Sequence, residues 1–214
     1  MRIVLLITTL LLATSCASSS PAPAPPAAAT PRDVLSDLSH ERVAYWVERF
    51  SKGDKRAEIA AAFARKPQVE QVISDKLRRR GMPQELIYLA MAESGLNPEA
   101  HSTADAVGIW QLVPGTARQY GLRVDETVDE RRDLEKSTDA ALSYLSYLYN
   151  RFGSWYLAAA AYNAGENRIS GIIESGTDAD YFRVWDQLPG ETRDYVPAMI
   201  ALARIGRDRA RYGF

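Results

Sequence analysis

Three short polar blocks interrupt otherwise apolar, helical sequence and carry the groups best suited to chemistry. They span residues 93–94 (Glu-Ser), 108–112 (Gly-Ile-Trp-Gln-Leu) and 161–165 (Ala-Tyr-Asn-Ala-Gly). The first block supplies one carboxylic acid, Glu93, and the other two supply amide and phenol groups. These groups suit a ligand rich in hydroxyls and acetamides. The combination predicts an enzyme that acts on a sugar polymer with a single acid.

Glu93 stands at the end of an apolar helix expected over residues 84–94. It follows Leu86 by seven residues and Leu89 by four, so it shares their face of the helix. Burial there disfavours the charged carboxylate, and the macrodipole opposes negative charge at a helix C-terminus. Both effects raise the pKa, as a general acid near neutral pH requires. The alternative is a Glu at a frayed helix end that points into solvent.

The second and third blocks each allow a binding and a packing interpretation. Trp110 offers an apolar face for a sugar, and Gln111 offers an amide donor and acceptor. In the alternative, Trp110 and Leu112 belong to the core and Gln111 caps a neighbouring turn. Tyr162 and Asn163 end a helix that is otherwise apolar and small, so their polar groups need partners.

The elements that must position these groups are helices. Apolar residues recur at spacings of three and four, and no segment shows sustained alternation with period two. Pro67 is expected to interrupt one helix, Pro83 to begin the helix of Glu93, and Gly95 to cap its end. The sequence predicts a mostly α single domain. The expected helices cover residues 33–53, 57–65, 69–81, 84–94, 116–120, 137–152, 156–164, 167–175 and 192–211.

Length and composition limit the possible functions. The chain has 214 residues, 46% of them hydrophobic, which is enough for one well-buried domain. A net charge of -1 argues against nucleic acid as the main partner. The C-terminal basic cluster is expected to complement the end of the last helix, with contact to an anionic wall or lipid surface as the alternative. This cluster consists of Arg204, Arg207, Arg209 and Arg211.

No cofactor or metal is expected. His40 and His101 are far apart in the sequence, and neither belongs to a recognisable metal-binding motif. We find no Walker or dinucleotide-binding fingerprint. A monomer is expected.

The N-terminus predicts export and a lipid anchor. Residues 1–15 have the pattern of a lipoprotein signal peptide, whose apolar run 3–12 is too short to span a membrane in the mature protein. Cys16 is the expected lipidation site, and residues 16–31 form a Pro/Ala/Ser tether. By resemblance to lipoprotein sorting rules, Ala17 favours the outer membrane, with the protein facing the periplasm. The alternative is an ordinary secretory signal, which also exports the protein.

The polar blocks belong to a longer pattern that resembles the lytic transglycosylase domain of the soluble-lytic-transglycosylase type, related to goose-type lysozyme. Residues 129–138 and the Trp variant of the second block look most similar to the membrane-bound transglycosylase D type. The resemblance implies a lysozyme-like catalytic domain over residues 81–214, after an N-terminal helical region at 32–80. It is carried by residues 81–86, 93–98, 108–116, 161–166 and 191–197.

The resemblance also implies roles for particular residues. It makes Glu93 the catalytic acid and base, with Ser94 as its hydrogen-bonding neighbour. It places Tyr195 so that its side chain projects towards the acid. The positions that shape the saccharide site are Gln111, Tyr162 and Asn163.

Two features depart from the pattern of this family. Asp105 replaces the Gly or Asn usual in the loop before the second block. The chain also ends soon after the domain without LysM repeats, so targeting is expected to depend on the catalytic domain and the lipid anchor.

The implied reaction cleaves the β-1,4 bond between N-acetylmuramic acid and N-acetylglucosamine in peptidoglycan and forms a 1,6-anhydro product. One alternative is a lysozyme-like hydrolase, which generally needs a second carboxylate. The nearest candidates in the sequence are Glu99, Asp105 and Glu166, and each is expected to be solvated or to cap a helix. The other alternative is a non-catalytic lipoprotein that binds the wall.

Overall fold

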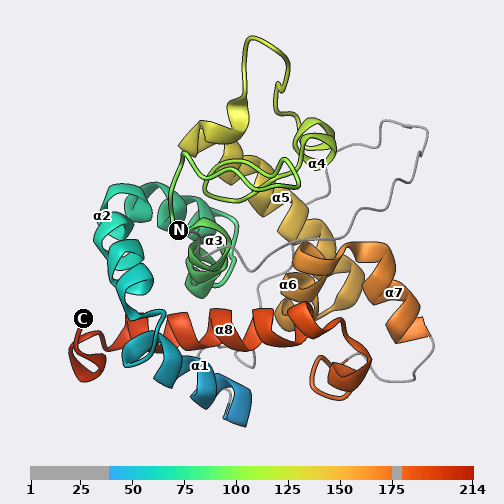
Figure 1. Ribbon diagram of the computed structural model, residues 1–214. Helices are drawn as coiled ribbons and strands as arrows, with labels where there is room; N and C mark the ends of the chain where they lie inside the picture. The colour runs from blue at the N-terminus through green and yellow to red at the C-terminus, as the bar shows by residue number, and fades with distance from the viewer. Residues whose placement is uncertain (1–38, 175–179) are drawn as a thin grey trace.

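The last long helix, α8 (Gly190–Arg207), lies at the centre of the packing. Its middle turns are buried on every side, which requires neighbours on several faces. Helices α1 (Glu41–Ser51), α3 (Ile87–Ser94) and α6 (Trp155–Ala164) supply these neighbours. Figure 1 shows α8 running beneath α3 and α6, with α1 along its lower side.

The computed structural model describes residues 39–174 and 180–214. This part of the chain contains eight α-helices and four short 3-10 helices. The remaining α-helices are α2 (Arg56–Arg79), α4 (Pro114–Gln119), α5 (Leu134–Phe152) and α7 (Glu166–Glu174). The 3-10 helices are η1 (Gln84–Leu86), η2 (Glu130–Arg132), η3 (Trp185–Gln187) and η4 (Ala210–Tyr212).

The prediction of a mostly α fold is confirmed. Within residues 39–174 and 180–214 there is no strand, and backbone pairing outside the helices is limited to isolated bridges. The predicted signal peptide, the lipidated Cys16 and the tether lie outside the described residues, as does the expected start of the first helix at 33–38. No described helix is long and apolar enough to cross a membrane.

One apolar core joins the N-terminal helices to the rest of the domain. Helix α1 packs along α8, and α2 packs against α3 and α5. Fully buried side chains of this core extend from Val43 on α1 to Ile205 on α8. Arg42 Nε also donates a hydrogen bond of 2.9 Å to the Asp194 carboxylate, which ties α1 to α8 at their polar edge.

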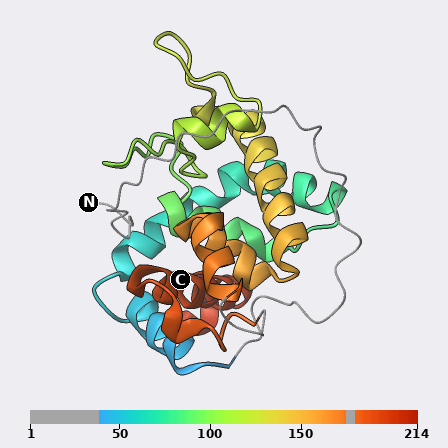
Figure 2. The same ribbon diagram turned by 90° about the vertical axis from the view of Figure 1, so that its right-hand side faces the viewer.

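The segment between α3 and α5 is mostly irregular and carries the second polar block. Apart from α4 and η2, it consists of loops and turns. Figures 1 and 2 both show these loops above the helical core, over the end of the molecule where α3 finishes. The fold therefore brings an irregular loop region to the C-terminal end of the helix that bears Glu93.

The expected interruption at Pro67 is wrong, because α2 runs without a break through this residue. Proline removes one backbone donor and clashes with the preceding turn. Phe63 and Val69 on either side of it are buried, so core packing holds the helix across the proline. The other expected helices lie where predicted, with ends that differ by a few residues. The helix of Glu93 begins with the 3-10 turn η1 after Pro83.

The internal proline predicts a stabilising substitution. Pro67 is exposed, so Pro67→Ala removes no core contact and restores a helical donor. We expect the free energy of unfolding to rise by about 1–2 kcal/mol, since the helical gain of up to about 3 kcal/mol is offset by the freer unfolded chain. Urea unfolding measures this, with the exposed neighbour Gln68→Ala as the control. A less stable Pro67→Ala protein would contradict this account of α2.

Candidate active site

Glu93 is the buried acid that the sequence predicts. It lies one residue before the end of α3, and only 8% of its surface is exposed. Gly95 then adopts the left-handed conformation with φ of 61°, as expected of a helix cap. Leu96 continues in the same region with φ of 61°, which is strained for a residue with a side chain. The interpretation of Glu93 as a solvent-facing residue is excluded.

The hydroxyl of Tyr195 is the direct partner of this acid. It lies 2.6 Å from Glu93 Oε1, and both side chains are buried. Burial raises the pKa of Glu93 to about 7, the hydrogen bond from Tyr195 opposes that rise, and the charge of Glu191 adds to it. Glu93 is therefore partly protonated at neutral pH. Tyr195 matches the position that the resemblance places towards the acid.

Glu191 is a second carboxylate near Glu93 that the sequence analysis missed. It stands on the first turn of α8, four residues before Tyr195, so both side chains lie on the same face of the helix. One of its carboxyl oxygens is buried and has no hydrogen-bond partner in the described chain. Burial raises the pKa of Glu191, and a hydrogen bond from Asn163 lowers it. In the sequence, the four-residue spacing between Glu191 and Tyr195 was the signal that could have placed Glu191 near the acid.

Ser94 holds the second block in place and does not bind the acid. Its hydroxyl donates to the Ile109 carbonyl at 2.8 Å and accepts from the Asn97 backbone N–H at 3.3 Å. The structure places no hydrogen bond between Ser94 and Glu93, unlike the contact implied by the resemblance. Ser94 therefore fastens the end of α3 to the loop that carries residues 108–112.

Trp110 belongs to the core, so of its two interpretations the packing one holds and the sugar-facing one is excluded. The side chain is fully buried, and its indole N–H donates to Thr138 Oγ1 at 3.0 Å. The alternative interpretation also holds for Gln111. Its Nε2 group donates to the carbonyls of Gly108 at 2.8 Å and Ala100 at 3.2 Å, so this amide nitrogen stabilises its own loop.

Tyr162 and Asn163 each have a separate partner at the end of α6. The Tyr162 hydroxyl donates to the Trp110 carbonyl at 2.7 Å. Burial raises its pKa well above the ordinary value, and the charge of Glu93 adds to the shift. Asn163 Oδ1 accepts from Thr192 Oγ1 at 2.9 Å. The third block thus joins the second block to the start of α8.

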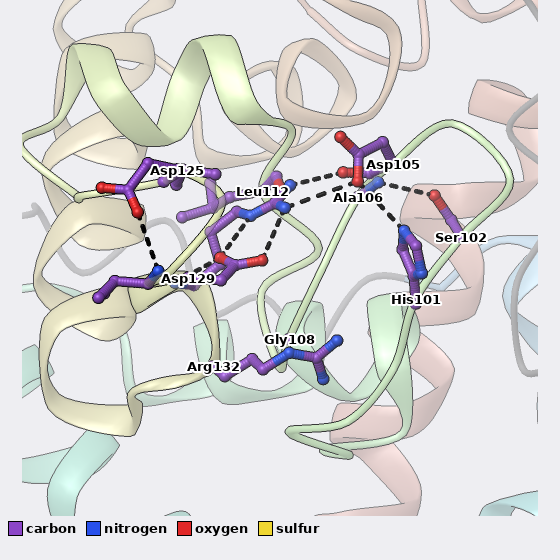
Figure 3. Close-up of polar contacts among 12 residues, drawn as sticks. His101, Ser102, Asp105, Ala106, Gly108, Leu112, Asp125, Asp129 and Arg132 are labelled. Carbon is purple, nitrogen blue, oxygen red and sulfur yellow. Dashed lines mark hydrogen bonds and ion pairs between the residues drawn. The ribbon is translucent and has the colours of Figure 1, made fainter.

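A buried arginine fixes the loop that carries the second block. Arg131 is 4% exposed, and its guanidinium makes two hydrogen bonds of 2.8 Å to the Asp129 carboxylate. It also donates to the backbone carbonyls of Asp105 at 2.6 Å and Leu112 at 3.2 Å. Figure 3 shows that Asp105, Leu112 and Asp129, the residues that accept these hydrogen bonds, lie close together. A bidentate, charge-assisted arrangement of this kind is strong and geometrically specific.

Two residues of the same loop have unusual backbone surroundings. Asp105 has φ of 58°, a conformation that favours Gly and Asn, and its carboxylate lies 3.1 Å from His101 Nε2. A Cβ atom placed on Gly108 would meet the Arg131 carbonyl at 2.1 Å, so only glycine allows this close approach.

The other carboxylates considered from the sequence do not join Glu93. Glu99 is exposed and binds Arg132 at 2.7 Å, and Asp105 faces His101 and Arg131. Glu166 begins α7 and lies 3.4 Å from the Tyr147 hydroxyl. Within the described residues, no group of three His, Cys, Asp or Glu side chains could hold a metal ion.

Comparison with known proteins identifies the family. The family model of the transglycosylase SLT domain matches residues 70–182, a segment that contains all three polar blocks. The chain belongs to the transglycosylase SLT domain family. Glu191 and Tyr195 lie beyond the matched segment, although the structure brings both to Glu93.

The chain matches only part of the length of each relative in this family. The chain is 42% identical over 146 residues to membrane-bound lytic murein transglycosylase D of Escherichia coli K12, which covers 66% of this chain and 32% of that protein. It is 32% identical over 120 residues to the soluble lytic murein transglycosylase of the same strain, covering 53% of this chain and 19% of the relative. The match thus spans 32% of the first relative and 19% of the second.

Solved structures agree on the fold. The 70-kDa soluble lytic transglycosylase of Escherichia coli superposes with a TM-score of 0.57 at 22% identity, covering 79% of this chain and 30% of that one. An inactive mutant of lytic transglycosylase Slt from Pseudomonas aeruginosa gives a TM-score of 0.56 at 24% identity, covering 66% and 24%. The predicted lysozyme-like helical fold matches the fold of these enzymes.

The contacts of Arg131 predict a strong difference between two adjacent arginines. Arg131→Lys keeps the charge but loses the planar fork, so we expect unfolding free energy to fall by about 2–4 kcal/mol. Arg132 is exposed and makes a surface ion pair, so Arg132→Lys is expected to change it by less than about 0.5 kcal/mol. Chemical denaturation of both variants measures the difference. Equal effects would show that Arg131 does not fix the loop.

Proposed function

We propose that this protein is a peptidoglycan lytic transglycosylase that uses Glu93 first as an acid and then as a base. The observation that carries the proposal is the buried Glu93 carboxyl, which is held by Tyr195 and has a pKa raised to about 7. The family match and the names of the relatives support the reaction class and peptidoglycan as the substrate.

In the first step, protonated Glu93 donates its proton to the glycosidic oxygen. The bond between that oxygen and the anomeric carbon of N-acetylmuramic acid breaks, and the N-acetylglucosamine unit leaves with a hydroxyl. Positive charge builds on the anomeric carbon, and the acetamide oxygen of the substrate stabilises it. Tyr162 or Asn163 orients that acetamide. A raised pKa favours this step, because a proton is present on the acid near neutral pH.

In the second step, the Glu93 carboxylate accepts the proton of the C6 hydroxyl of the muramic acid unit. The C6 oxygen then bonds to the anomeric carbon and closes the 1,6-anhydro ring. Glu93 is protonated again, and no water is consumed. The Tyr195 hydroxyl stabilises the carboxylate between the two steps, because it hydrogen-bonds that form directly.

A lysozyme-like hydrolase is a second candidate function, because Glu191 could serve as its second carboxylate. A hydrolase generally needs a carboxylate to position water, and Glu191 has a buried oxygen without a partner near Glu93. The products distinguish the two reactions: hydrolysis leaves reducing ends, and transglycosylation leaves anhydro ends.

The cellular setting is part of the same proposal. Lipidation of Cys16 would anchor the protein to the outer membrane, with residues 16–31 as the tether and the domain of residues 81–214 facing the wall. The membrane-bound relative supports an envelope location. We propose that the protein acts there as a monomer on glycan strands.

The decisive experiment is mass spectrometry of peptidoglycan fragments released by residues 32–214. We expect 1,6-anhydromuramyl products from the unchanged sequence and a loss of at least about a thousandfold in rate from Glu93→Gln, because that variant cannot exchange a proton. Glu85→Gln on the preceding 3-10 turn is the matched control and keeps full activity. Reducing ends as the main product would favour the hydrolase. Equal activity of Glu93→Gln would overturn both mechanisms.

The charge of Glu191 predicts a pH effect. Activity requires protonated Glu93, so it should fall as pH rises through about 7. Glu191→Gln removes a charge that raises the pKa of Glu93, so this fall should move to lower pH. A pH profile of kcat/KM measures the shift. An unchanged profile for Glu191→Gln would show that the two carboxyl groups do not interact.

A further inference from the structure

A small cavity lies among α2, the turn η1 and the helices α3 and α8. Its volume is about 260 Å³. Sites for drug-sized molecules typically have about 300–1,000 Å³, so this cavity suits only a small ligand. Ile87, Tyr88 and Ala203 provide buried, largely apolar surface, and polar and charged side chains line the rest, among them Lys66 and Glu70.

The cavity lies at the opposite end of the α3–α8 pair from the acid. At one end of this pair, Glu93 of α3 accepts a hydrogen bond from Tyr195 of α8. At the other end, Tyr88 of α3 lies against Gly206 of α8. Gly206 follows Tyr195 by eleven residues, which is a rise of about 16 Å along a helix. Figure 1 shows this end of α8 below α2, next to the C-terminus. The cavity is therefore separate from the candidate active site.

Tyr88 brings to this cavity a hydroxyl that the protein does not use. Tyr88 is 8% exposed, and its hydroxyl makes no hydrogen bond within the described part of the chain. A buried phenol usually has a hydrogen-bond partner. Burial raises the pKa of Tyr88 to about 12, the charges of Glu70 and Glu85 add to this rise, and that of Arg209 opposes it. The phenol therefore keeps its proton at neutral pH and remains a donor.

The position of this hydroxyl depends on a glycine of α8. A Cβ atom on Gly206 would lie 2.0 Å from the hydroxyl oxygen of Tyr88, so a larger residue would displace the phenol. Ala203 and Arg207 both line the cavity and stand four residues apart, on one face of α8. Gly206 lies between them in the sequence, three residues after Ala203. The hydroxyl thus lies against the part of α8 that forms the cavity wall.

Charged groups of both signs line the cavity and limit the possible ligands. Lys66 Nζ forms an ion pair with Glu70, four residues further along α2, and lies 5.8 Å from the centroid of the Tyr88 ring. Arg207 is a second cationic side chain in the lining. The carboxylate of Glu70 repels a phosphate, and the charges of Lys66 and Arg207 repel a metal ion. A ligand that carries both a carboxylate and an ammonium group complements both signs.

We propose that this cavity is a binding site for a zwitterion of about dipeptide size. The ligand's carboxylate accepts hydrogen bonds from the Tyr88 hydroxyl and Lys66 Nζ, and its ammonium group lies against the Glu70 carboxylate. Its aliphatic part packs on Ile87 and Ala203. The ligand thereby gives the Tyr88 hydroxyl a partner and extends the ion pair of α2. The site takes no part in bond cleavage, because it lies at the other end of α3 from Glu93.

The test is a titration of the purified protein with alanyl-alanine, followed through the backbone amide signals in NMR spectra. We expect saturable shifts around Tyr88 and Gly206 and none around Glu93. Two analogues test the recognition of charge: N-acetyl-alanyl-alanine lacks the ammonium group, and alanyl-alanine amide lacks the carboxylate. Each should bind about tenfold more weakly, because one charge-assisted contact is lost.

Variants assign these contacts to particular side chains. Tyr88→Phe keeps the packed ring and removes only the hydroxyl, so the affinity for alanyl-alanine should fall about tenfold. Tyr45→Phe is the matched control, because Tyr45 is 42% exposed on α1 and its hydroxyl accepts from Arg49. It should bind with unchanged affinity. Lys66→Gln removes the cation that faces the carboxylate, so this variant should lose most of its preference for alanyl-alanine over the amide.

Three results would overturn the proposal. They are the absence of saturable shifts around Tyr88, equal affinities for alanyl-alanine and its two analogues, and an unchanged affinity in Tyr88→Phe. None of them bears on the cleavage reaction, because anhydro products from peptidoglycan are measured separately.

Discussion

The structure depends on the burial of one carboxyl group between α3 and α8. A buried ionised carboxylate is costly unless it is paired, and no cation is among the groups that shift the pKa of Glu93. The protein instead shifts the group towards its neutral form and gives its charged form one hydrogen bond, from Tyr195. This leaves the acid able to exist in both states near pH 7, which the proposed two-step reaction requires. The buried centre of α8 fixes Tyr195, and α3 fixes Glu93.

The surrounding polar groups mainly hold one another. Ser94 and Tyr162 both donate to backbone carbonyls of the second block, so the ends of α3 and α6 are joined through one loop. That loop contains strained positions at Asp105 and Gln111, each of the order of 1 kcal/mol. Arg131 compensates by donating hydrogen bonds to two backbone carbonyls of this loop. Ser94, Gln111 and Tyr162 thus hold the backbone of the second block, and a buried polar oxygen without a partner in the described part of the chain lies at Glu191.

Much of the fold and part of the site could be predicted from the sequence. Helical periodicity placed Glu93 on a buried face, and the order of the motifs indicated the fold. Trp110 could not be assigned in this way, because only the packing of α5 shows that its N–H meets Thr138. Glu191 was missed because its proximity to Glu93 arises from the tertiary contact between α3 and α8. Pro67 was misjudged because local propensity says nothing about the buried residues on either side of it.

The central claim is that Glu93 titrates near neutral pH in the folded protein. The most direct measurement is NMR titration of the glutamate side-chain carboxyl carbons, assigned by comparison with Glu93→Gln. We expect one resonance, absent from the variant, to titrate with a pKa of about 7, well above the value of about 4.3 for an ordinary glutamate. If every glutamate titrates in the ordinary range, the carboxyl of Glu93 is ionised at neutral pH and the account of a buried acid is contradicted.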